Sequence, residues 1–514
     1  MQSVDIITDI EKIRSLLRSD VSRIVIEAPA GCGKTYEAVS LACDIGSALP
    51  DASVLLLTHT NSAKNEFARR AATAKGANRV RISTIDSFLL DLCSPHAAAL
   101  GLPFPLRVAL SEGSIDISAL GKKALDLLNR SPIVAQVLRV RYPVIILDEH
   151  QDASTTQNEV IEVIARSGGV RTRSFGDPMQ AIYDFDGDGV DWENLKVSAD
   201  AICMLTIPWR WTDKPQLGAW INDARKCLAQ QQPLPPIPQG TGVSVSIIQG
   251  VGDPGYAQHL DSKLVAPLWA FESDSSCAVL TYTNKRANAL AMQTGGSFTL
   301  NEGAELKLAR DTILAMCVAD GDAQRLAAIV VQTLGAAAVG FDATKREQCL
   351  AALKPTALNI GRKKQVASVL ESLADIYLVP SVMAACRALG KIVQSPPEWL
   401  KRIQYPRNVE AIVAVADSSD HPQEAIESII AHGRQAKVVR RTISTVHKAK
   451  GLEYEAVMLW NFSAVDFPID EERARLLYVA ISRPTQRLVL LAPGLAVSPF
   501  AEELESVRKS SSED

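Results

Sequence analysis

Short apolar runs in the N-terminal third of the chain each end in a glycine or a polar cluster, and helical patterning separates them. The runs lie at 21–26, 54–57 and 144–147, and the more polar segments 80–83 and 173–175 are also expected to be strands. Buried runs that alternate with helices predict a parallel sheet that is covered by helices. Because the carboxyl ends of parallel strands meet at one edge of a sheet, we expect the polar clusters to form a site there.

The C-terminal half repeats this pattern around a long helical segment. Expected strands lie at 243–248, 278–280, 438–444, 456–459 and 488–491, and expected helices at 305–317, 323–334, 344–353, 362–377 and 381–392. The sequence therefore predicts an α/β fold with two parallel-sheet cores, each interrupted by a helical insertion. The predicted first core comprises 1–90 and 142–206 around an insertion at 91–141, and the predicted second core comprises 207–296 and 436–514 around a larger insertion at 297–435.

Composition limits the class of protein without identifying a partner. The chain has 514 residues, of which 47% are hydrophobic and 22% charged, as in globular proteins of several domains. The formal net charge is -4 and the pI is about 6.1. A contact with nucleic acid would therefore have to come from a local basic patch.

Cysteine usage and the apolar segments bear on location. The nine cysteines are scattered without a C-x-x-C pair, which argues against zinc and iron–sulfur sites and favours a reducing compartment. The N-terminus lacks the basic region of a secretory signal, and the most apolar stretch, 326–341, is too short for a membrane span. We therefore expect a cytoplasmic protein without membrane contact.

The segment A-P-A-G-C-G-K-T is a phosphate-binding loop between a predicted strand and a predicted helix. Its glycines allow backbone amides to turn toward phosphates at a helix N-terminus. Lys34 offers a positive charge to the phosphates, and Thr35 offers a hydroxyl to Mg²⁺. The nucleotide-binding residues of this loop are Ala30, Gly31, Cys32, Gly33, Lys34 and Thr35.

Three further side chains are candidates for ATP hydrolysis. Asp148 and Glu149 follow the buried run V-I-I-L, so that Asp148 can hold Mg²⁺ and Glu149 can orient and deprotonate the attacking water. Gln180, in G-D-P-M-Q-A-I-Y, is placed to sense the γ-phosphate. A pair of surface acids is the alternative for Asp148 and Glu149, and the apolar run before them argues against it.

Phosphoryl transfer also needs cations that stabilise the charge on the transferring group. Arg210 in I-P-W-R-W and Arg483 in V-A-I-S-R are the candidates, and a surface arginine beside aromatic residues is the alternative for Arg210. If both reach ATP bound to the first core, the two cores close on the nucleotide and open after hydrolysis.

An ordered set of motifs runs along nearly the whole chain. It consists of A-P-A-G-C-G-K-T, T-H-T-N-S-A, S-T-I-D-S-F, D-E-H-Q-D, G-D-P-M-Q-A-I-Y, P-W-R-W, T-V-H-K-A-K-G-L-E and R-L-L-Y-V-A-I-S-R. The set resembles superfamily 1 DNA helicases of the UvrD/PcrA/Rep family. The resemblance implies two RecA-like P-loop cores and movement on single-stranded or tailed DNA, 3′ to 5′, that depends on ATP and Mg²⁺.

The resemblance also implies roles for residues outside the phosphate-binding loop. Trp209 would stack on adenine, Glu453 would bind a ribose hydroxyl, and His447 and Gly451 would couple the nucleotide state to DNA. Aromatic stacking and phosphate contacts would hold DNA of any sequence. The implied DNA-binding residues are Thr58, His59, Asn61, Ser83, Thr84, Tyr183, Phe185 and His447.

Departures from the family pattern leave a second interpretation open. No glutamine that could read adenine stands clearly before the loop, and Asp186 replaces a usual DNA-contacting arginine. The sequence after Arg483 leaves no room for a nuclease domain. The chain is also similar in size and layout to the helicase-like subunit of Gabija-type anti-phage systems. The alternative is therefore a DNA-sensing ATPase subunit with a nuclease partner.

Overall fold

The computed structural model describes most of the chain, in two compact units. The described residues are 6–49, 51–111, 115–183, 188–248, 276–294, 298–301, 306–355, 364–403, 405–418, 421–432, 440–494 and 496–504. Unit 1 comprises Met1–Ile247, Phe462–Ala492 and Ala496–Asp514, and unit 2 comprises Ile248–Asn461 and Pro493–Leu495. Several elements of the predicted second core, α10 (Pro215–Ala229) and α22 (Glu471–Ile481) among them, thus lie in unit 1. The domain boundaries predicted from the sequence stay a prediction.

Unit 1 contains a seven-stranded sheet in which every pair of neighbouring strands is parallel. Its strands are β1 (Ile6–Ile7), β2 (Arg23–Glu27), β3 (Val54–Thr58), β4 (Val80–Thr84), β5 (Val144–Leu147), β6 (Arg171–Gly176) and β7 (Ala201–Met204), in the order β1-β7-β2-β6-β5-β3-β4. The five strands predicted for this part of the chain are confirmed. The sequence did not predict β1 or β7.

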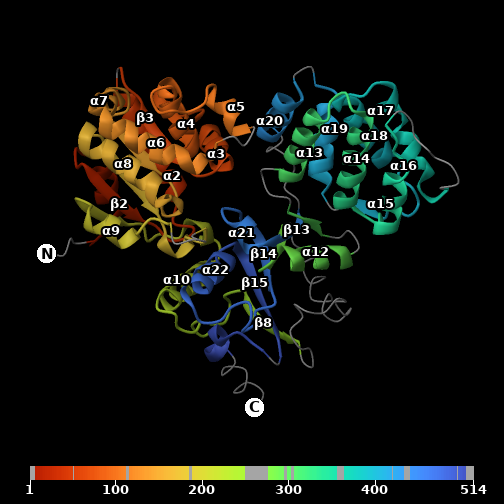
Figure 1. The fold of residues 1–514 in the computed structure, drawn as a ribbon. Helices are drawn as coiled ribbons and strands as arrows, with labels where there is room; N and C mark the ends of the chain where they lie inside the picture. The colour runs from red at the N-terminus through yellow and green to blue at the C-terminus, as the bar shows by residue number, and fades with distance from the viewer. Residues whose placement is uncertain are drawn as a thin grey trace, which may run out of the picture. The chain divides into compact units, whose positions relative to one another are not determined.

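Helices cover both faces of this sheet (Figure 1). They are α1 (Ile10–Arg18), α2 (Lys34–Ala48), α3 (Asn61–Ala71), α4 (Ile85–Cys93), α5 (Leu106–Ser111), α6 (Ile117–Arg130), α7 (Pro132–Arg141), α8 (Thr155–Gly168) and α9 (Trp192–Val197). One buried cluster joins α1, α2 and α3 to the sheet, and another joins α4, α6 and α8 to it. The predicted helical character of 91–141 is confirmed by α5, α6 and α7.

The remaining described elements of unit 1 come from later in the chain. They include α10, α22, and, except for their last residues, β8 (Val243–Ile248) and β15 (Pro484–Pro493). Helices α10 and α22 pack against each other, and α22 also contacts the short turn Pro178–Gln180 that follows β6. This packing brings the last predicted motif to the sheet that carries the phosphate-binding loop.

Unit 2 contains four neighbouring parallel strands and a helical insertion. The strands run in the order β10 (Thr299–Leu300), β13 (Arg441–Thr445), β9 (Cys277–Thr281) and β14 (Tyr454–Trp460), flanked by α12 (Asn284–Gln293) and α21 (Val446–Ala449). The insertion comprises α13 (Lys307–Val318), α14 (Ala323–Ala337), α15 (Ala343–Leu350), α16 (Ala367–Ser372), α17 (Ala374–Leu378), α18 (Val382–Gln394), α19 (Pro406–Val415) and α20 (Pro422–His432). One hydrophobic cluster, drawn entirely from 306–430, holds these helices together.

One predicted helix in the insertion was wrong in form. The segment predicted as continuous over 362–377 is described from 364 and consists of a 3₁₀ turn, α16 and α17. The break falls at Leu373, whose N–H donates to the carbonyls of both Val369 and Leu370 at 3.2 and 3.1 Å. This tight turn keeps Leu373 and Ile376 in the buried cluster while the chain changes direction. Predicted residues 362–363, 438 and 439 lie outside the described residues.

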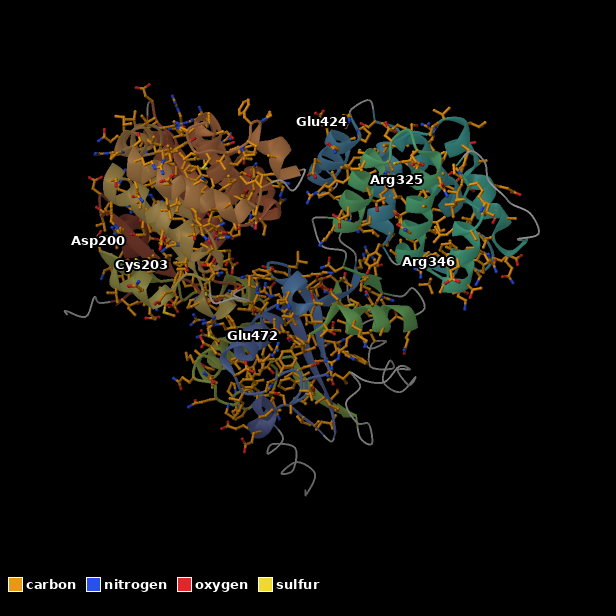
Figure 2. All side chains as sticks on the ribbon, in the orientation of Figure 1. Asp200, Cys203, Arg325, Arg346, Glu424 and Glu472 are labelled. Atoms are coloured by element: carbon orange, nitrogen blue, oxygen red, sulfur yellow. The ribbon has the colours of Figure 1, made fainter. Side chains whose placement is uncertain are left out.

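The two sets of parallel strands, with helices around them, confirm the predicted α/β fold class. All nine cysteines are free thiols, as in the case of the fully buried Cys203 on β7 (Figure 2). Among the described residues, no helix combines the length and the apolar character that a membrane crossing requires.

Candidate nucleotide-binding and catalytic site

The carboxyl ends of five strands in unit 1 carry the predicted polar clusters at one edge of the sheet. Strand β2 leads into the phosphate-binding loop, β3 ends at Thr58, β4 ends at Thr84, β5 leads into Asp148 and β6 leads into Asp177. All of these strands are parallel, so their ends share that edge.

The phosphate-binding loop has the backbone conformation that its glycines predict. Gly31 and Gly33 have positive φ angles of 74° and 82°, and Gly33 is the N-cap of α2. The loop therefore ends at the N-terminus of a 15-residue helix, where backbone amides and the helix dipole favour an anion.

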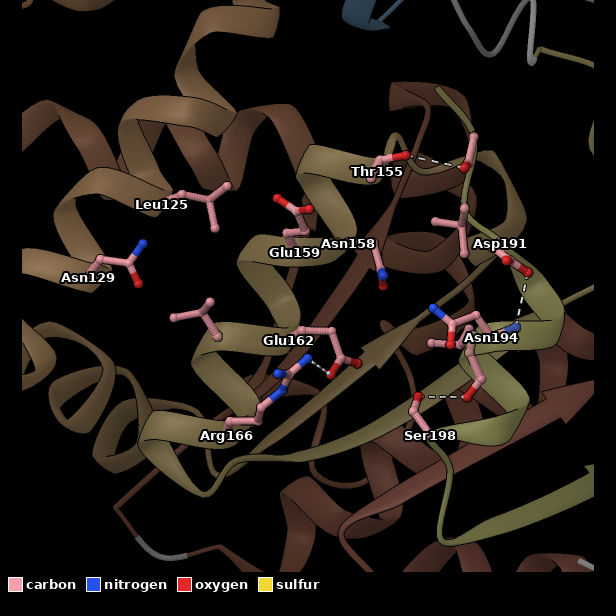
Figure 3. Close-up of a pocket in the computed structure, with 14 residues that line it drawn as sticks. Leu125, Asn129, Thr155, Asn158, Glu159, Glu162, Arg166, Asp191, Asn194 and Ser198 are labelled. Atoms are coloured by element: carbon pink, nitrogen blue, oxygen red, sulfur yellow. Dashed lines mark hydrogen bonds and ion pairs between the residues drawn. The ribbon is translucent and has the colours of Figure 1, made fainter. Parts of the chain in front are cut away.

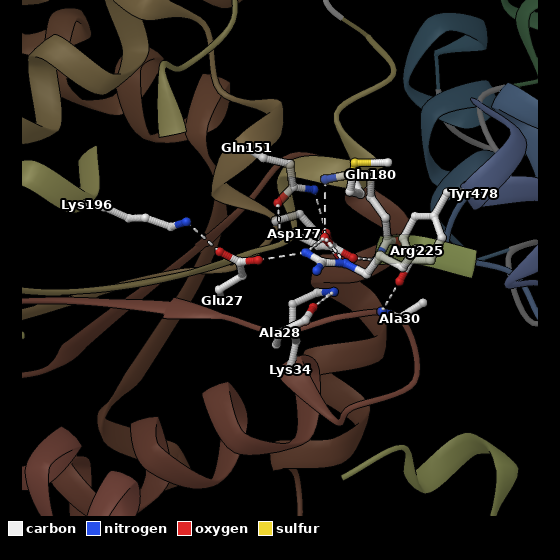
Figure 4. A network of polar contacts seen from close by, with 12 residues as sticks. Glu27, Ala28, Ala30, Lys34, Gln151, Asp177, Gln180, Lys196, Arg225 and Tyr478 are labelled. Carbon is white, nitrogen blue, oxygen red and sulfur yellow. Dashed lines mark hydrogen bonds and ion pairs between the residues drawn. The ribbon is translucent and has the colours of Figure 1, made fainter. Parts of the chain in front are cut away.

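Lys34 and Ala30 already have hydrogen-bond partners in the free protein. The Lys34 ammonium donates to the Ala28 carbonyl at 2.9 Å, and the Ala30 N–H donates to the Tyr478 hydroxyl at 2.9 Å (Figure 4). Lys34 is 7% exposed and Tyr478, on α22, is 1% exposed. These contacts join the loop to α22 and to its own backbone, and a phosphate would compete for the Lys34 ammonium.

The segment Trp209–Trp211 lies directly against the loop. A Cβ atom at Gly31 would come within 2.8 Å of Arg210 Cβ and 2.9 Å of Trp211 Cζ3, and one at Gly33 within 3.2 Å of Trp209 Cδ1. The glycines are thus required by close approach as well as by backbone conformation. Trp209 itself is 53% exposed, which leaves its ring accessible to a planar ligand.

Cys32, inside the loop, is a buried thiol. Burial raises the pKa of Cys32 to about 11, with opposition from the Lys34 charge. The side chain is therefore protonated at neutral pH and unsuited to nucleophilic chemistry. The predicted role of Cys32 is to bind phosphate through its backbone N–H, and this role does not depend on the thiol.

Asp148 has the properties of a ligand for a divalent cation. Its carboxylate is 2% exposed, and its Oδ1 accepts no hydrogen bond from any described residue. Burial, reinforced by the Glu149 charge, raises the pKa of Asp148 to about 8, while Lys34 opposes the shift. A bound cation would offset the cost of this buried charge. Together with the half-buried Thr35, Asp148 fits the small number of protein ligands that Mg²⁺ takes beside phosphates.

Glu149 adopts a strained backbone conformation at the position predicted for the general base. Its φ and ψ of 53° and 41° lie in the left-handed region, which residues other than glycine seldom adopt. One carboxylate oxygen, Oε2, accepts a hydrogen bond from Gln151 Nε2 at 2.7 Å.

Gln180 and Arg483 meet in the interior of unit 1. Arg483 Nη2 donates to Gln180 Oε1 at 3.4 Å, and Gln180 Nε2 donates to Asp177 Oδ2 at 2.8 Å. Arg483 is 1% exposed and Gln180 is 4% exposed. The two residues predicted to act on the γ-phosphate are therefore in contact with each other.

Arg210 is held beside the same helix end. Its Nη1 donates to the Ser482 carbonyl at 2.6 Å, and its guanidinium lies 5.5 Å from the centre of the Trp211 ring. The structure thus brings Lys34, Gln180, Arg210 and Arg483 into one unit around the loop. The alternative of an unconnected surface arginine does not describe Arg210.

The residues predicted for DNA binding in unit 1 differ in accessibility. Thr58, Ser83 and Thr84 are buried, and the Thr84 hydroxyl caps α4 by accepting from the Ser87 N–H at 3.1 Å. Tyr183 is 47% exposed, and His59 is half-buried. Asn61 is the first residue of α3, while Phe185 and Asp186 lie outside the described residues.

The predicted coupling residues lie in unit 2. His447 is on the four-residue helix α21, with its ring 6.5 Å from the ring of Tyr282. Gly451 has a φ of 79°, and both Gly451 and Glu453 are exposed in the turn that precedes β14. Their predicted roles toward the nucleotide and DNA stay predictions.

Several residues of the polar network were not assigned roles from the sequence, among them Glu27, Asp177, Arg225 and Tyr478. Arg225 occupies the buried face of α10 with Leu217, Ile221 and Leu228. Helical spacing predicts an apolar residue there, so a charged side chain in that register was the available signal. Tyr478 belongs to the motif R-L-L-Y-V-A-I-S-R, but nothing in the sequence indicated a contact with the loop.

A cavity of about 560 Å³ lies elsewhere in unit 1, between α6, α8 and α9 (Figure 3). Its wall includes Glu159, Asp191 and an ion pair between Arg166 and Glu162 at 3.3 Å. None of the predicted nucleotide-binding or DNA-binding residues lines this cavity. It is separate from the candidate site.

Comparison with known families finds two matching segments. Residues 106–195 match the family model of the UvrD/REP helicase N-terminal domain, and residues 442–491 match that of the UvrD-like helicase C-terminal domain. The first segment contains Asp148, Glu149 and Gln180, and the second contains His447, Glu453 and Arg483.

Curated relatives align over short segments. A protein of Streptococcus thermophilus that is named as a subunit of an ATP-dependent helicase/nuclease is 30% identical over 104 residues, which are 20% of this chain and 8% of that protein. The exonuclease/helicase subunit RexA of Lactococcus lactis subsp. cremoris is 33% identical over 103 residues, again 20% and 8%. The chain thus matches about a twelfth of the length of these relatives.

A solved structure of Pif1 helicase from Candida albicans aligns with 98% of this chain and 98% of its own, at a TM-score of 0.40 and 13% identity. That likeness adds nothing to the sheet topology described above. The two family matches, by contrast, fall on segments that carry the predicted motifs. At the level of domains they support the resemblance: one segment matches the model of the N-terminal domain and another that of the C-terminal domain of UvrD-like helicases.

Proposed function

We propose that this chain is an ATP-dependent DNA helicase or translocase that moves on single-stranded DNA from 3′ to 5′. The observation that carries the proposal is the contact between Gln180 and Arg483 beside the phosphate-binding loop. A glutamine that orients water and an arginine that stabilises the developing charge are groups used in phosphoryl transfer, and this pair would supply them. The helicase domain matches support DNA as the track.

In the proposed reaction, ATP binds with its phosphates at the N-terminus of α2. Lys34 leaves the Ala28 carbonyl and pairs with the phosphates, while Asp148 and Thr35 would hold Mg²⁺, which neutralises phosphate charge. Glu149 orients the attacking water and accepts its proton. Arg210 and Arg483 stabilise the charge that develops on the transferring group.

Movement along DNA would follow from coupling this site to the DNA track. His447 and Gly451 would respond to the nucleotide state, while Trp209 would stack on adenine and Glu453 would bind the ribose. The proposed contacts with DNA come from Thr58, His59, Asn61, Ser83, Thr84, Tyr183 and Phe185.

The free thiols support a reducing compartment, such as the cytoplasm, as the place where the protein works.

Steady-state ATP hydrolysis by the purified chain, with and without single-stranded DNA, tests the proposal. We expect DNA to stimulate turnover, and the chain to displace a strand from a duplex with a 3′ tail but not from one with a 5′ tail. The Lys34→Ala variant should show neither DNA-stimulated ATP hydrolysis nor strand displacement. Hydrolysis that ignores DNA, with no displacement from either duplex, would contradict a DNA motor.

A second candidate is a DNA-sensing ATPase subunit that works beside a nuclease, as in anti-phage defence. The names of the two relatives, which join helicase with nuclease or exonuclease, favour it. It predicts that DNA stimulates ATP hydrolysis while neither tailed duplex is unwound. Displacement of long strands by the chain alone would exclude this candidate.

A further inference from the structure

Arg225 is a charged residue on the buried face of α10. The side chain is 8% exposed and lies on the same face of the helix as Leu217, Ile221 and Leu228. A guanidinium in such a position is unfavourable unless its charge and its N–H groups are matched. The partners that match it are all parts of the candidate site.

The guanidinium of Arg225 joins two acidic residues at the carboxyl edge of the sheet (Figure 4). Nη2 lies 2.7 Å from Asp177 Oδ1 and 2.7 Å from Glu27 Oε1, and Nε lies 3.2 Å from Asp177 Oδ1. The second oxygen of Glu27 pairs with Lys196 Nζ at 2.7 Å. Arg225 thereby links α10 to the ends of β2, which leads into the loop, and of its neighbour β6.

Asp177 connects Arg225 to Gln180 through hydrogen bonds from both of its carboxylate oxygens. Its Oδ1 accepts from Arg225 and from the Met179 N–H at 3.2 Å, while its Oδ2 accepts from Gln180 Nε2 at 2.8 Å. Because the amide nitrogen of Gln180 is held by Asp177, its Oε1 faces Arg483 Nη2 at 3.4 Å. The direction of the Gln180 amide thus depends on an anionic Asp177.

The charge of Asp177 depends in turn on Arg225. Asp177 is fully buried, and burial alone would raise its pKa, but Arg225, with help from Lys34 and the Gln180 hydrogen bond, lowers the pKa below the ordinary value. A positive charge with two N–H groups on one carboxylate oxygen is what fixes this anion. A lysine would keep the charge but lose the planar fork.

We propose that Arg225 is a positioning residue for ATP hydrolysis, which acts through Asp177 to orient Gln180 against Arg483. The proposal rests on the proposed function of this site. It assigns Arg225 no contact with ATP, so its loss lowers the rate of the chemical step and leaves nucleotide affinity in place.

The test compares Arg225→Lys with Lys226→Met, a matched change at the exposed neighbour on α10, whose ammonium pairs with Asp223 at 2.8 Å. We expect Arg225→Lys to lower kcat by about tenfold or more, with KM and the affinity for a fluorescent non-hydrolysable ATP analogue within about threefold of wild type. Lys226→Met should leave kcat unchanged. Thermal melting of each variant checks that it is folded.

A double-mutant cycle separates positioning from a general structural effect. If Arg225 acts through Gln180, then Arg225→Lys in a Gln180→Ala background should lower kcat by no more than about twofold further. A full additional loss in that background would overturn the proposal, as would wild-type kcat in folded Arg225→Lys. Where Arg225→Lys does not fold, Asp177→Asn takes its place, and wild-type turnover by that variant would equally overturn the proposal.

ATP hydrolysis by the wild-type protein distinguishes a failure of the proposed function from a failure of the proposed role of Arg225. If it hydrolyses no ATP, with or without DNA, the proposed function of the site fails. If it hydrolyses ATP and Arg225→Lys does so equally well, only the role of Arg225 fails.

Discussion

The two segments with the predicted nucleotide chemistry differ in how firmly the free protein holds them. In unit 1, Lys34, Gln180 and Arg483 are buried and have hydrogen-bond partners within the network. In unit 2, Gly451 and Glu453 are exposed in a turn, and His447 is half-buried on a short helix. Lys34, Gln180 and Arg483 thus lie inside a packed network, whereas Gly451 and Glu453 face solvent, where a ligand can reach them.

The largest effect should come from removing the cation of the phosphate-binding loop. We expect Lys34→Ala to lower ATP turnover by about 1,000-fold or more, because no other lysine or arginine is predicted to pair with the phosphates in the ground state. Steady-state phosphate release measures this. Lys12→Ala, at an exposed position on α1, is the control and should keep wild-type turnover. Near-normal turnover by Lys34→Ala would remove the loop from the reaction.

Glu149→Gln should separate nucleotide binding from hydrolysis. The amide keeps the size of the side chain but cannot accept a proton from water, so we expect kcat to fall by about 100-fold while ATP affinity is retained. Equilibrium titration and single-turnover hydrolysis measure the two quantities. Glu159→Gln, at an exposed position on α8, is the matched control. Equal losses in affinity and rate would show that Glu149 supports the fold of the site instead.

The pH dependence of stability tests whether His150, the residue after Glu149, is held neutral by burial in the folded protein. Burial lowers the pKa of His150 to about 4, whereas the unfolded chain binds this proton near pH 6.5. Its contribution to stability is therefore complete above pH 6.5 and is lost as the pH falls toward 4. We expect the free energy of unfolding to drop by about 3 kcal/mol through this group.

Denaturant melts of wild type and His150→Gln at pH 7 and pH 4.5 measure this slope. The variant should lose less stability between the two pH values than wild type does. His96→Gln shows what a histidine-to-glutamine change does outside the site. An identical slope in wild type and His150→Gln would mean that His150 is not held neutral in the folded state.

The smallest of these effects concerns the segment in unit 2. We expect His447→Ala to leave ATP hydrolysis without DNA within about twofold of wild type and to reduce stimulation by single-stranded DNA about tenfold. Parallel assays with and without DNA measure the ratio. Lys391→Ala on α18 is the control. A loss of DNA-independent hydrolysis equal to that of Glu149→Gln would mean that His447 takes part in hydrolysis itself. It would then contradict a role limited to coupling with DNA.

The features that the sequence predicted best combine a buried run with a polar cluster. Strands β2, β3 and β5 carry that double signal, because a strand inside a parallel sheet is mostly apolar and its carboxyl end carries the site, whereas β6 reads R-T-R-S-F-G and is followed by the polar residue Asp177. Strand β7 reads only A-I-C-M, and β1 has two residues, so neither gave a comparable pattern. The turn at Leu373 depends on packing in the insertion, which periodicity alone does not reveal.

The candidate site was predicted where motif and chemistry coincide, and missed where a contact joins distant parts of the chain. Asp148 and Lys34 could be assigned from local sequence. The contact between Ala30 and Tyr478 spans 448 positions, and that between Asp177 and Arg225 spans 48. Such pairs are formed by the packing of α10 and α22, and no local pattern specifies the partner.

The helical insertion of unit 2 begins after β10 and ends before β13, which are neighbouring parallel strands with Thr299 opposite Thr442. Its two attachments are therefore close together, and its hydrophobic cluster is its own. Segments with adjacent ends and a separate core are the ones that genomes add, exchange or delete without loss of the host fold. By this reasoning the insertion can be exchanged while the parallel strands that flank it stay the same.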